Sequence, residues 1–270
     1  MDEPLAGSAP QARLWVLLEQ PGPWGKEAVT ESHLDPTIGR ALQTWALDHP
    51  VRLGLIRRPG RHADDGSKVH RRTVLLARSD PGESWLRREQ ITDPRSLLDV
   101  DLRALLSEPA TSAAPRSPTL LVCTNAKRDR CCALLGRPLA AHLEATTKAD
   151  IWETSHLGGH RFAPTLVSLP DGYLFGGPLA GTLSTTACRG RSTLVPEAQV
   201  AELAALRHLG LRQPRALEVL PGAGGQWRVQ APGQPPVVVL VERQSARTQR
   251  EESCGKPPTS WGPLTASLIS

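Results

Sequence analysis

The sequence has no long hydrophobic segment. Its strongest apolar runs, "LWVLL" from Leu14 and "VVVLV" from Val237, are far shorter than a membrane span, which needs about 20 residues. The chain begins with "MDEPLAGSAPQ", which is acidic and contains prolines, unlike a secretory signal. We therefore expect a cytoplasmic protein that does not associate with a membrane.

Aromatic residues are scarce, and neither sign of charge dominates. Seven Trp, two Phe and one Tyr occur among 270 residues, and 32 basic against 27 acidic residues give a formal charge of +5. The basic residues are spread along the chain and interleaved with acidic ones. Nucleic-acid binding requires clustered basic charge and, for single strands, aromatic side chains on which bases stack. We therefore expect no nucleic-acid partner.

Cysteine is also scarce, but it is unevenly distributed. Three of the five cysteines, Cys123, Cys131 and Cys132, lie within "CTNAKRDRCC". An odd number with this crowding does not suit a secreted disulfide framework, whereas in a reducing compartment it indicates metal or redox chemistry. Cys188 is best interpreted as a buried apolar residue, and the same interpretation suits Cys254.

The order of the expected elements repeats on either side of a linker, "SEPATSAAPRSP" at 107–118. Before the linker we predict strands at 13–19, 51–56, 73–79 and 84–89, with helices near 36–48 and 94–106. After it we predict strands at 119–123, 150–154, 165–169 and 172–176, with helices at 131–146 and 196–210. This order is that of a thioredoxin-like α/β unit, although any α/β chain alternates in a similar way.

The predicted fold is therefore α/β, with two tandem thioredoxin-like units. Residues 1–112 form a degenerate half without metal ligands, because all five cysteines lie beyond it. Residues 113–245 form the half that carries the metal site, and they end in extra strands after residue 215. Residues 246–270 are polar and rich in Pro and Gly, so we expect a flexible tail.

Two histidines follow the strand predicted at 150–154. His156 and His160 stand four residues apart in "SHLGGHRFAPT", and the two glycines between them, Gly158 and Gly159, disfavour a helix and permit a sharp turn. Cys123 ends another predicted strand, and loops that follow parallel strands gather at one edge of a sheet. Thiolate and imidazole are both common metal ligands. We therefore expect the cysteines and the histidines to meet at one metal site.

The sequence resembles the sucrase/ferredoxin-like family of thioredoxin-like [2Fe–2S] proteins. The resemblance rests on C-x8-C followed by H-x3-H and "RFAPT", and "LLEQPGPWG", "CTNAKRDRCCALLGRPLA" and "CGKPP" support it. It implies that Cys123 and Cys132 bind one iron of a [2Fe–2S] cluster, and that His156 and His160 bind the other. It also implies an electron carrier, rather than a catalyst, that exchanges electrons with redox partner proteins. Pro164 lies where thioredoxin-like folds place a cis proline.

Histidine ligation would change the chemistry of such a cluster. With two thiolates and two neutral imidazoles the oxidised cluster carries no net charge, whereas four thiolates give it two negative charges. An electron is added more easily to the less negative cluster, so the reduction potential is higher, as in Rieske centres. A ligating imidazole also keeps a second nitrogen that binds a proton, which couples reduction to pH.

Two other functions compete with the electron carrier. A structural Cys2His2 zinc site fits H-x3-H, but eight residues between the cysteines exceed the usual two to four. A thiol-disulfide oxidoreductase would use Cys131 or Cys132, but the sequence contains no C-x-x-C and adjacent cysteines form a strained disulfide. Neighbours on a helix point about 100° apart, so only one of these two cysteines can face the site easily. The resemblance implies that it is Cys132, because the family spacing has eight residues between the cysteines.

Several other charged residues are open to two interpretations. The basic side chains near the predicted site either form a docking patch for an acidic redox partner or belong to a solvated loop. They are Lys127, Arg128, Arg130 and Arg161. His142 and His208 lie in predicted helices, so we expect them to be structural.

Overall fold

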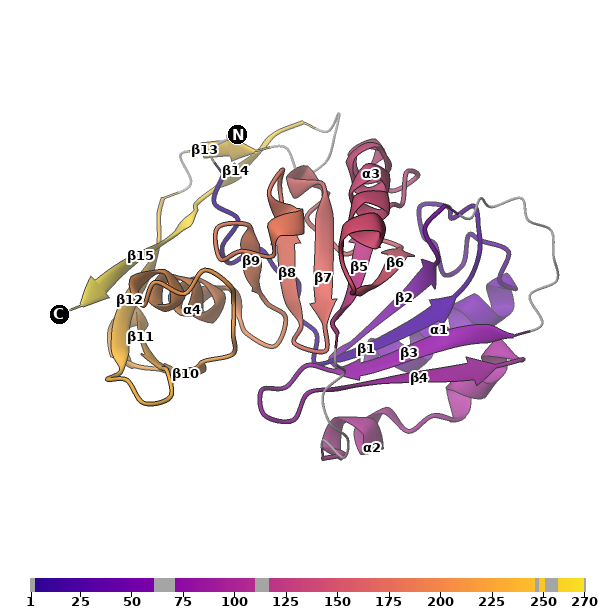
Figure 1. Ribbon diagram of the computed structural model, residues 1–270, viewed down its shortest axis with the longest axis horizontal. Coiled ribbons are helices and arrows are strands. Elements are labelled where there is room, and N and C mark those ends of the chain that lie inside the picture. Colours follow the sequence, from indigo (N-terminus) through magenta and orange to yellow (C-terminus); the bar gives the residue numbers. More distant parts are fainter. Residues whose placement is uncertain (1–2, 61–70, 110–116, 246–247, 251–256, 270) are drawn as a thin grey trace.

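The computed structural model describes residues 3–60, 71–109, 117–245, 248–250 and 257–269. A mixed sheet of nine strands runs through the centre of the molecule, and a smaller four-stranded sheet lies at one end (Figure 1). The predicted α/β class is therefore confirmed. No described helix is long and apolar enough to cross a membrane.

The first half of the large sheet contains four strands in the order β4-β3-β1-β2. Strands β1 and β2 are parallel, and β3 and β4 are each antiparallel to their neighbour. The elements are β1 (Leu14–Glu19), α1 (Pro36–Leu47), β2 (Val51–Arg57), β3 (Arg72–Arg78), β4 (Trp85–Ile91), a 3-10 helix (Pro94–Asp99) and α2 (Leu102–Ser107). Helix α1 begins at Pro36, at the start of the helix predicted near 36–48. Asp35 caps it by accepting a hydrogen bond from the backbone N–H of Thr37.

The second half repeats this arrangement in the order β8-β7-β5-β6, with a ninth strand beside β8. Again the first two strands, β5 and β6, are parallel and the next two are antiparallel to their neighbours. The elements are β5 (Thr119–Cys123), α3 (Arg130–Thr146), β6 (Asp150–Thr154), a 3-10 helix (His160–Phe162), β7 (Thr165–Leu169), β8 (Tyr173–Gly176), a 3-10 helix (Ala180–Thr182), β9 (Cys188–Arg191) and α4 (Pro196–His208). The strand order therefore occurs twice, as the repeated sequence pattern predicts.

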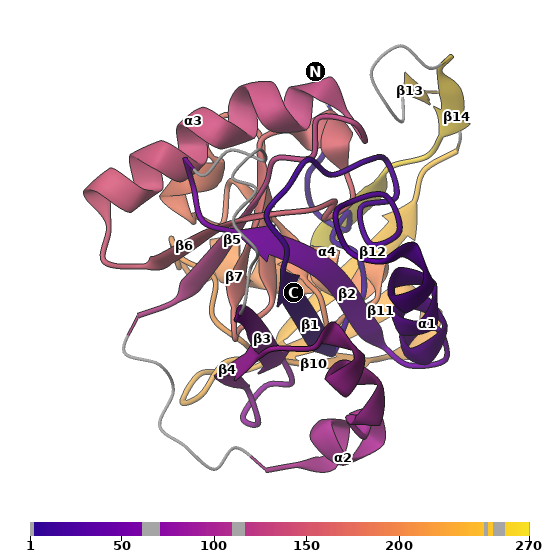
Figure 2. The same cartoon turned by 90° about the vertical axis from the view of Figure 1, so that its right-hand side faces the viewer.

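The two halves join where β2 pairs with β6 in antiparallel fashion, at Ile56 with Thr154 and Arg57 with Glu153. Because only the last residues of the two strands pair, the carboxyl ends of β2 and β6 meet at this junction. Helix α1 packs against the first half of the continuous sheet and helix α3 against the second half (Figure 1 and Figure 2).

Alternation along the central strands creates three apolar cores. In β1, Leu14 and Val16 pack with Leu42 of α1, whereas Trp15 and Leu17 point the other way. The second core, which contains Trp15 and Leu17, also includes buried residues of the second half and is shared by both. Its members from the second half include Leu121, Cys123, Cys132, Trp152 and Val167. The cysteines predicted to bind metal therefore lie in the core that joins the halves.

The smaller sheet has the order β10-β11-β12-β15 and packs against α4, through apolar residues that include Leu203 and Val239. Its strands are β10 (Glu218–Pro221), β11 (Gln226–Gln230), β12 (Val237–Arg243) and β15 (Leu264–Ile269), with a 3-10 helix at Ala223–Gly225. A two-stranded sheet of β13 (Thr248–Arg250) and β14 (Thr259–Trp261) completes the described chain.

Two details differ from the sequence predictions. Residues 264–269 are not a flexible tail, because β15 pairs along the open edge of β12 from Val238 to Arg243 and satisfies its backbone groups. Residues 246–247, 251–256 and 270 of the predicted tail, Cys254 among them, lie outside the described residues. The single helix predicted at 94–106 is two short ones, because the Asp101 side chain caps a new helix by accepting from two backbone N–H groups.

Candidate metal centre

The two predicted cysteine ligands meet inside the shared core. Cys123 is the last residue of β5 and Cys132 lies in the first turn of α3. Both side chains have no exposed surface, and their thiols are hydrogen-bonded to each other. Asp129 caps α3 by accepting a hydrogen bond from the backbone N–H of Cys131, which fixes the start of the helix beside the strand.

A glycine in α3 allows this close approach. A Cβ atom placed at Gly136 would lie 2.2 Å from the carbonyl oxygen of Cys123, so no larger residue fits without movement of the helix or the strand. Cys132 stands one helical turn before Gly136, and the distance between the two cysteines therefore depends on this contact.

The two histidines face each other in the loop after β6. The ring centroids of His156 and His160 are 5.1 Å apart with an interplanar angle of 40°, and the His156 side chain also hydrogen-bonds to Cys123. The intervening glycines, Gly158 and Gly159, both adopt the left-handed conformation, with φ of 83° and 68°. The expected sharp turn is therefore present, and residues with a Cβ would be strained there.

These contacts make a continuous series of the four predicted ligands, from Cys132 through Cys123 and His156 to His160. Among the described residues, the buried Nδ1 atom of His156 has no hydrogen-bond partner, although buried polar atoms usually have one. Within the same described ranges, no three or more His, Cys, Asp and Glu side chains are grouped so that they could hold a metal ion. The donors lie as a pair of thiols and a pair of imidazoles.

The thiol pair is electrostatically polarised. The Cys132 thiol lowers the pKa of Cys123 well below its usual value, against the effect of burial, and His156 and the backbone N–H groups of Asn125 and Leu157 lower it further. The same hydrogen bond, burial and the Cys123 charge raise the pKa of Cys132. The hydrogen bonds to the Cys123 sulfur therefore favour negative charge on it over negative charge on Cys132.

Two arginines enclose the histidine loop from opposite halves of the molecule. Arg52 of β2 donates from Nη2 to the carbonyl oxygen of His156 at 2.9 Å, and Arg189 of β9 donates from Nη1 to that of Gly158 at 2.9 Å. Arg189 also donates to the Ser8 carbonyl and hydroxyl. Burial, together with the charges of Arg161 and Arg52, lowers the pKa of Arg189 to about 9.

Sequence reasoning did not identify either arginine as part of the site. Arg52 lies in the half without cysteines, 104 residues before the histidine that it contacts, and Arg189 lies in an edge strand. Neither position carries a sequence signal that would indicate this contact. In the structure Arg189 packs so closely on Gly159 that a Cβ there would lie 2.2 Å from Nη2 of Arg189.

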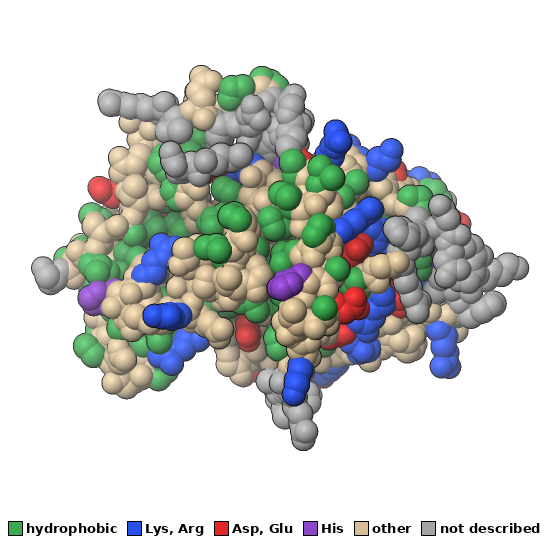
Figure 3. Space-filling view, turned by 45° about the horizontal axis from the view of Figure 1, so that its top comes forward, with side chains coloured by type: hydrophobic (Ala, Val, Ile, Leu, Met, Phe, Trp, Pro, Cys, Tyr) green, Lys and Arg blue, Asp and Glu red, His purple; other side chains and the backbone are tan. Residues whose placement is uncertain are grey.

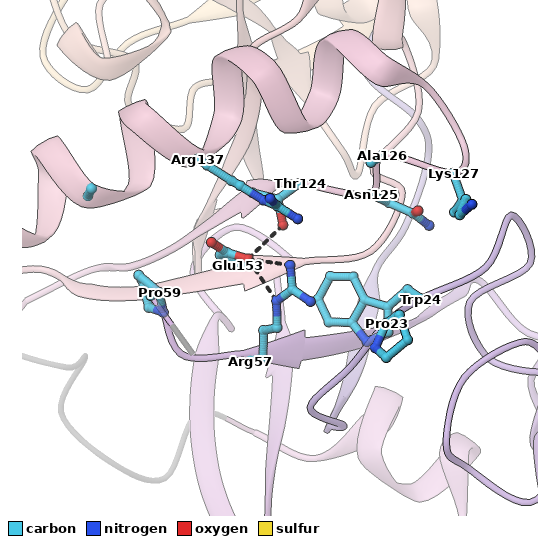
Figure 4. A pocket seen from close by; sticks show the side chains of 12 residues that line it. Pro23, Trp24, Arg57, Pro59, Thr124, Asn125, Ala126, Lys127, Arg137 and Glu153 are labelled. Carbon is cyan, nitrogen blue, oxygen red and sulfur yellow. Dashed lines mark hydrogen bonds and ion pairs between the residues drawn. The ribbon is translucent and has the colours of Figure 1, made fainter. Parts of the chain in front are cut away.

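A cavity of about 380 Å³ opens beside the site, at the junction of the halves (Figure 4). Its wall contains a buried ion pair in which Nη2 of Arg57 lies 2.7 Å from Oε2 of Glu153, and the Thr124 hydroxyl donates to the same oxygen. The Arg57 guanidinium also lies 4.3 Å from the centroid of a Trp24 ring. This pair fixes the end of β2 against β6, next to the residue that follows Cys123.

The basic residues near the site differ in their surroundings. Arg128 is paired with Glu27 at 2.5 Å and Arg161 with Glu3 at 2.9 Å, so both are part of the structure. Lys127 is exposed on the loop after β5 and Arg130 on the first turn of α3. On the face in Figure 3, basic and acidic side chains of the described residues lie close together rather than in separate areas.

The remaining predicted residues are placed as follows. Cys131 is partly buried beside the fully buried Cys132. Cys188 has no exposed surface and packs in the core under α4, as predicted for an apolar role, and burial raises the pKa of its thiol. His142 lies exposed on α3 and His208 ends α4. The bond between Ala163 and Pro164 is cis.

Comparison with known proteins gave one match. A family model described as sucrase/ferredoxin-like matches residues 5–201, a range that includes both halves of the large sheet. Neither the comparison with curated proteins nor that with solved structures found a match.

Proposed function

Because the chain belongs to the sucrase/ferredoxin-like family, we propose that it is an electron carrier with a [2Fe–2S] cluster. Its ligands are Cys123, Cys132, His156 and His160. When bound, such a cluster accepts and releases one electron. The observation that carries the proposal is the continuous series of contacts from Cys132 through Cys123 and His156 to His160.

The pairing of the donors favours two metal ions over one. The two thiols contact each other and the two imidazole rings face each other, so one pair is available for each iron. A structural zinc site would instead require all four donors to converge on a single ion. The proposed assignment gives the thiolate pair to the iron beside β5 and the imidazole pair to the iron beside the loop after β6.

The surrounding residues suit a negatively charged sulfur site. Cys123 has the lowered pKa of a thiolate, and the backbone N–H groups of Asn125 and Leu157 point to it. Thiolates and sulfides accept hydrogen bonds from N–H groups, which also tune the potential of iron–sulfur clusters. Complete burial of both cysteines keeps water away from this side of the site.

The competing thiol-disulfide activity is disfavoured by the same burial. A redox-active dithiol needs a thiolate that its substrate disulfide can reach, and Cys132 has no exposed surface. Its neighbour Cys131 is only partly buried, but adjacent cysteines form a strained disulfide. The proposal is therefore a carrier of electrons rather than a catalyst of disulfide exchange.

We further propose that each half of the large sheet is a thioredoxin-like unit. The order 4-3-1-2, with a parallel central pair and an antiparallel third strand, occurs in both halves. Residues 1–112 are then a unit without ligands and residues 113–245 include the ferredoxin unit. The cytoplasm, where thiols stay reduced, suits this site. Redox partner proteins with acidic surfaces would dock near the exposed Lys127 and Arg130.

Pulsed electron paramagnetic resonance tests the ligand set directly. The full chain is produced with 15N-histidine, reduced anaerobically, and measured for hyperfine coupling of nitrogen to the cluster. We expect strong coupling from two histidine nitrogens, and from only one in His160→Cys. His142→Gln, which changes an exposed histidine of α3, is the control and should leave both couplings unchanged. A reduced cluster without strongly coupled histidine nitrogen would contradict the proposal.

A further inference from the structure

The histidine loop is enclosed by two guanidinium groups that lack acidic partners. Among the described residues, no carboxylate oxygen lies within salt-bridge distance of Arg52 or Arg189, although eleven other arginines have such a partner. Arg189 is only 1% exposed and Arg52 is partly buried. A buried charge without a counter-charge is costly, so proteins keep such charges paired or use them.

A cysteine, rather than a carboxylate, offers these two arginines negative charge. The Cys123 thiolate acts electrostatically on both arginines, whose hydrogen bonds go to main-chain oxygens of the histidine loop and of Ser8. The charges of Arg52 and Arg189 therefore outnumber the one cysteine charge that acts on both of them. The two arginines would stabilise additional negative charge near the histidine loop.

We propose that Arg52, which the half without ligands supplies, is a positioning residue whose charge favours the reduced form of the cluster. The inference rests on the proposed function. One-electron reduction would add one negative charge to a cluster held partly by His156, the residue whose carbonyl oxygen Arg52 contacts. A fixed positive charge near an electron acceptor stabilises the reduced form more than the oxidised form, and low dielectric strengthens the effect. Arg52 therefore raises the reduction potential.

Arg52 is better suited to a test than Arg189. Arg189 is fully buried and holds Ser8 as well as Gly158, so its replacement would disturb packing in addition to charge. Among the described residues, the Arg52 side chain donates a hydrogen bond to His156 alone. Strand β2 pairs with β1 through backbone groups, so this pairing does not need the Arg52 side chain. Its charge can be removed with less disturbance of the fold.

The experiment compares midpoint potentials of the full-length, cluster-loaded protein by anaerobic redox titration. For Arg52→Gln we expect the equilibrium constant for reduction to fall about tenfold, which for one electron is a potential about 59 mV lower. Arg52→Lys keeps the charge and should remain close to wild type. Arg40→Gln removes an exposed arginine from α1 of the same half and is the control, with no shift expected.

The outcomes separate this inference from the proposed function. A wild-type protein without iron would overturn the proposed function itself. A loaded Arg52→Gln protein with the potential of Arg40→Gln would overturn only the role of Arg52. If Arg52→Gln folds by circular dichroism but takes up no cluster, Arg52→Met and Arg52→Lys decide. Cluster uptake by Arg52→Lys but not by Arg52→Met would support a requirement for the positive charge. Absence of the cluster from both variants would contradict it, because the hydrogen bond of Arg52 rather than its charge would then be required.

Discussion

The two halves of the large sheet share their strand order but differ at the end of their first strand. β5 ends in Cys123, buried against α3, whereas β1 ends in Glu19, whose carboxylate accepts a hydrogen bond from the backbone N–H of Thr73. In each half a glycine of the first long helix also lies in close contact with the backbone of another segment. A Cβ at Gly39 would lie 2.3 Å from the Val29 carbonyl oxygen, close to the 2.2 Å found at Gly136.

This comparison separates what the fold requires from what the site requires. Close packing of a helix against the neighbouring chain occurs in both halves, so it belongs to the architecture. Residues 1–112 contain no cysteine, and the two histidines whose rings face each other, His156 and His160, lie in the second half. The first half nevertheless takes part in the site, because Arg52 holds the histidine loop and the Leu55 backbone N–H donates to the Ser155 hydroxyl. The first half therefore supports a loop whose predicted ligands all lie in the second half.

The largest expected effect is loss of the cluster when Cys132 is replaced. Cys132→Ser removes the thiol that contacts Cys123, so we expect the visible absorption of the cluster to disappear or change strongly. Cys131→Ser is the matched control, because its side chain is only partly buried, and it should leave the spectrum nearly unchanged. The opposite pattern would mean that Cys131 is the ligand.

The paired glycines offer a second test of the comparison. Gly136→Ala and Gly39→Ala each force a Cβ against a carbonyl oxygen, so each should lower the free energy of unfolding by about 2–3 kcal/mol in chemical denaturation. Only Gly136→Ala should also reduce cluster occupancy, since it moves Cys132 away from Cys123. Equal loss of cluster in both variants would show that general destabilisation is responsible.

The reduction potential should depend on pH because the ligating histidines of the second half take up a proton, and histidines of the first half should not contribute. Reduction adds a negative charge and favours proton uptake by a ligating imidazole, so the potential falls as pH rises between the protonation midpoints of the two oxidation states. For one proton per electron the slope is about 59 mV per pH unit. His33→Gln, at an exposed position of the first half, should leave this slope intact. A potential that is independent of pH in wild type would argue against histidine ligation.

The smallest effect concerns the ion pairs between the halves. Asp150 of β6 lies 2.6 Å from Arg58 and is also paired with Arg88, both from the first half. Burial alone would raise the pKa of Asp150, but hydrogen bonds from Arg58 and Trp152 and the two arginine charges lower it overall. The ionised aspartate therefore stabilises the fold above its unfolded-state pKa of about 4, and this contribution is lost as pH falls further.

Asp150→Asn tests this contribution by denaturation at two pH values. The variant should be about 1 kcal/mol less stable than wild type at pH 7, and the difference should shrink below pH 4, where wild type loses the same charge. Asp99→Asn, an exposed change in the first half, should have little effect at either pH. A deficit that is the same at both pH values would mean that the ion pairs contribute nothing.

Much of the fold could be predicted from the sequence because its signals are local. Hydrophobic runs marked the strands, and Asp35 with Pro36 marked the start of α1, since capping acts within a few residues. The strand β15 was missed because "LTASLI" is a weak pattern that becomes a strand only when β12 offers it an open edge. Pairing partners of this kind depend on tertiary structure.

The predicted ligands of the site could likewise be found from the sequence, whereas the arginines around them could not. The spacing of Cys123, Cys132, His156 and His160 can be read from the chain, and their side chains form one series of contacts. The positions of Arg52 and Arg189 could not be predicted, because they follow from the pairing of β2 with β6 and from the path of β9. Their distances in sequence from the ligands contain no periodicity that would indicate contact.

Metal analysis of the full chain, purified without oxygen, tests the central claim most directly. We predict a red-brown protein with about two irons and about two acid-labile sulfides per chain, measured by elemental analysis and sulfide assay. Anaerobic handling is essential, since a protein that has lost its cluster is also colourless. A colourless protein that contains one zinc ion per chain and no iron after anaerobic purification would contradict the account.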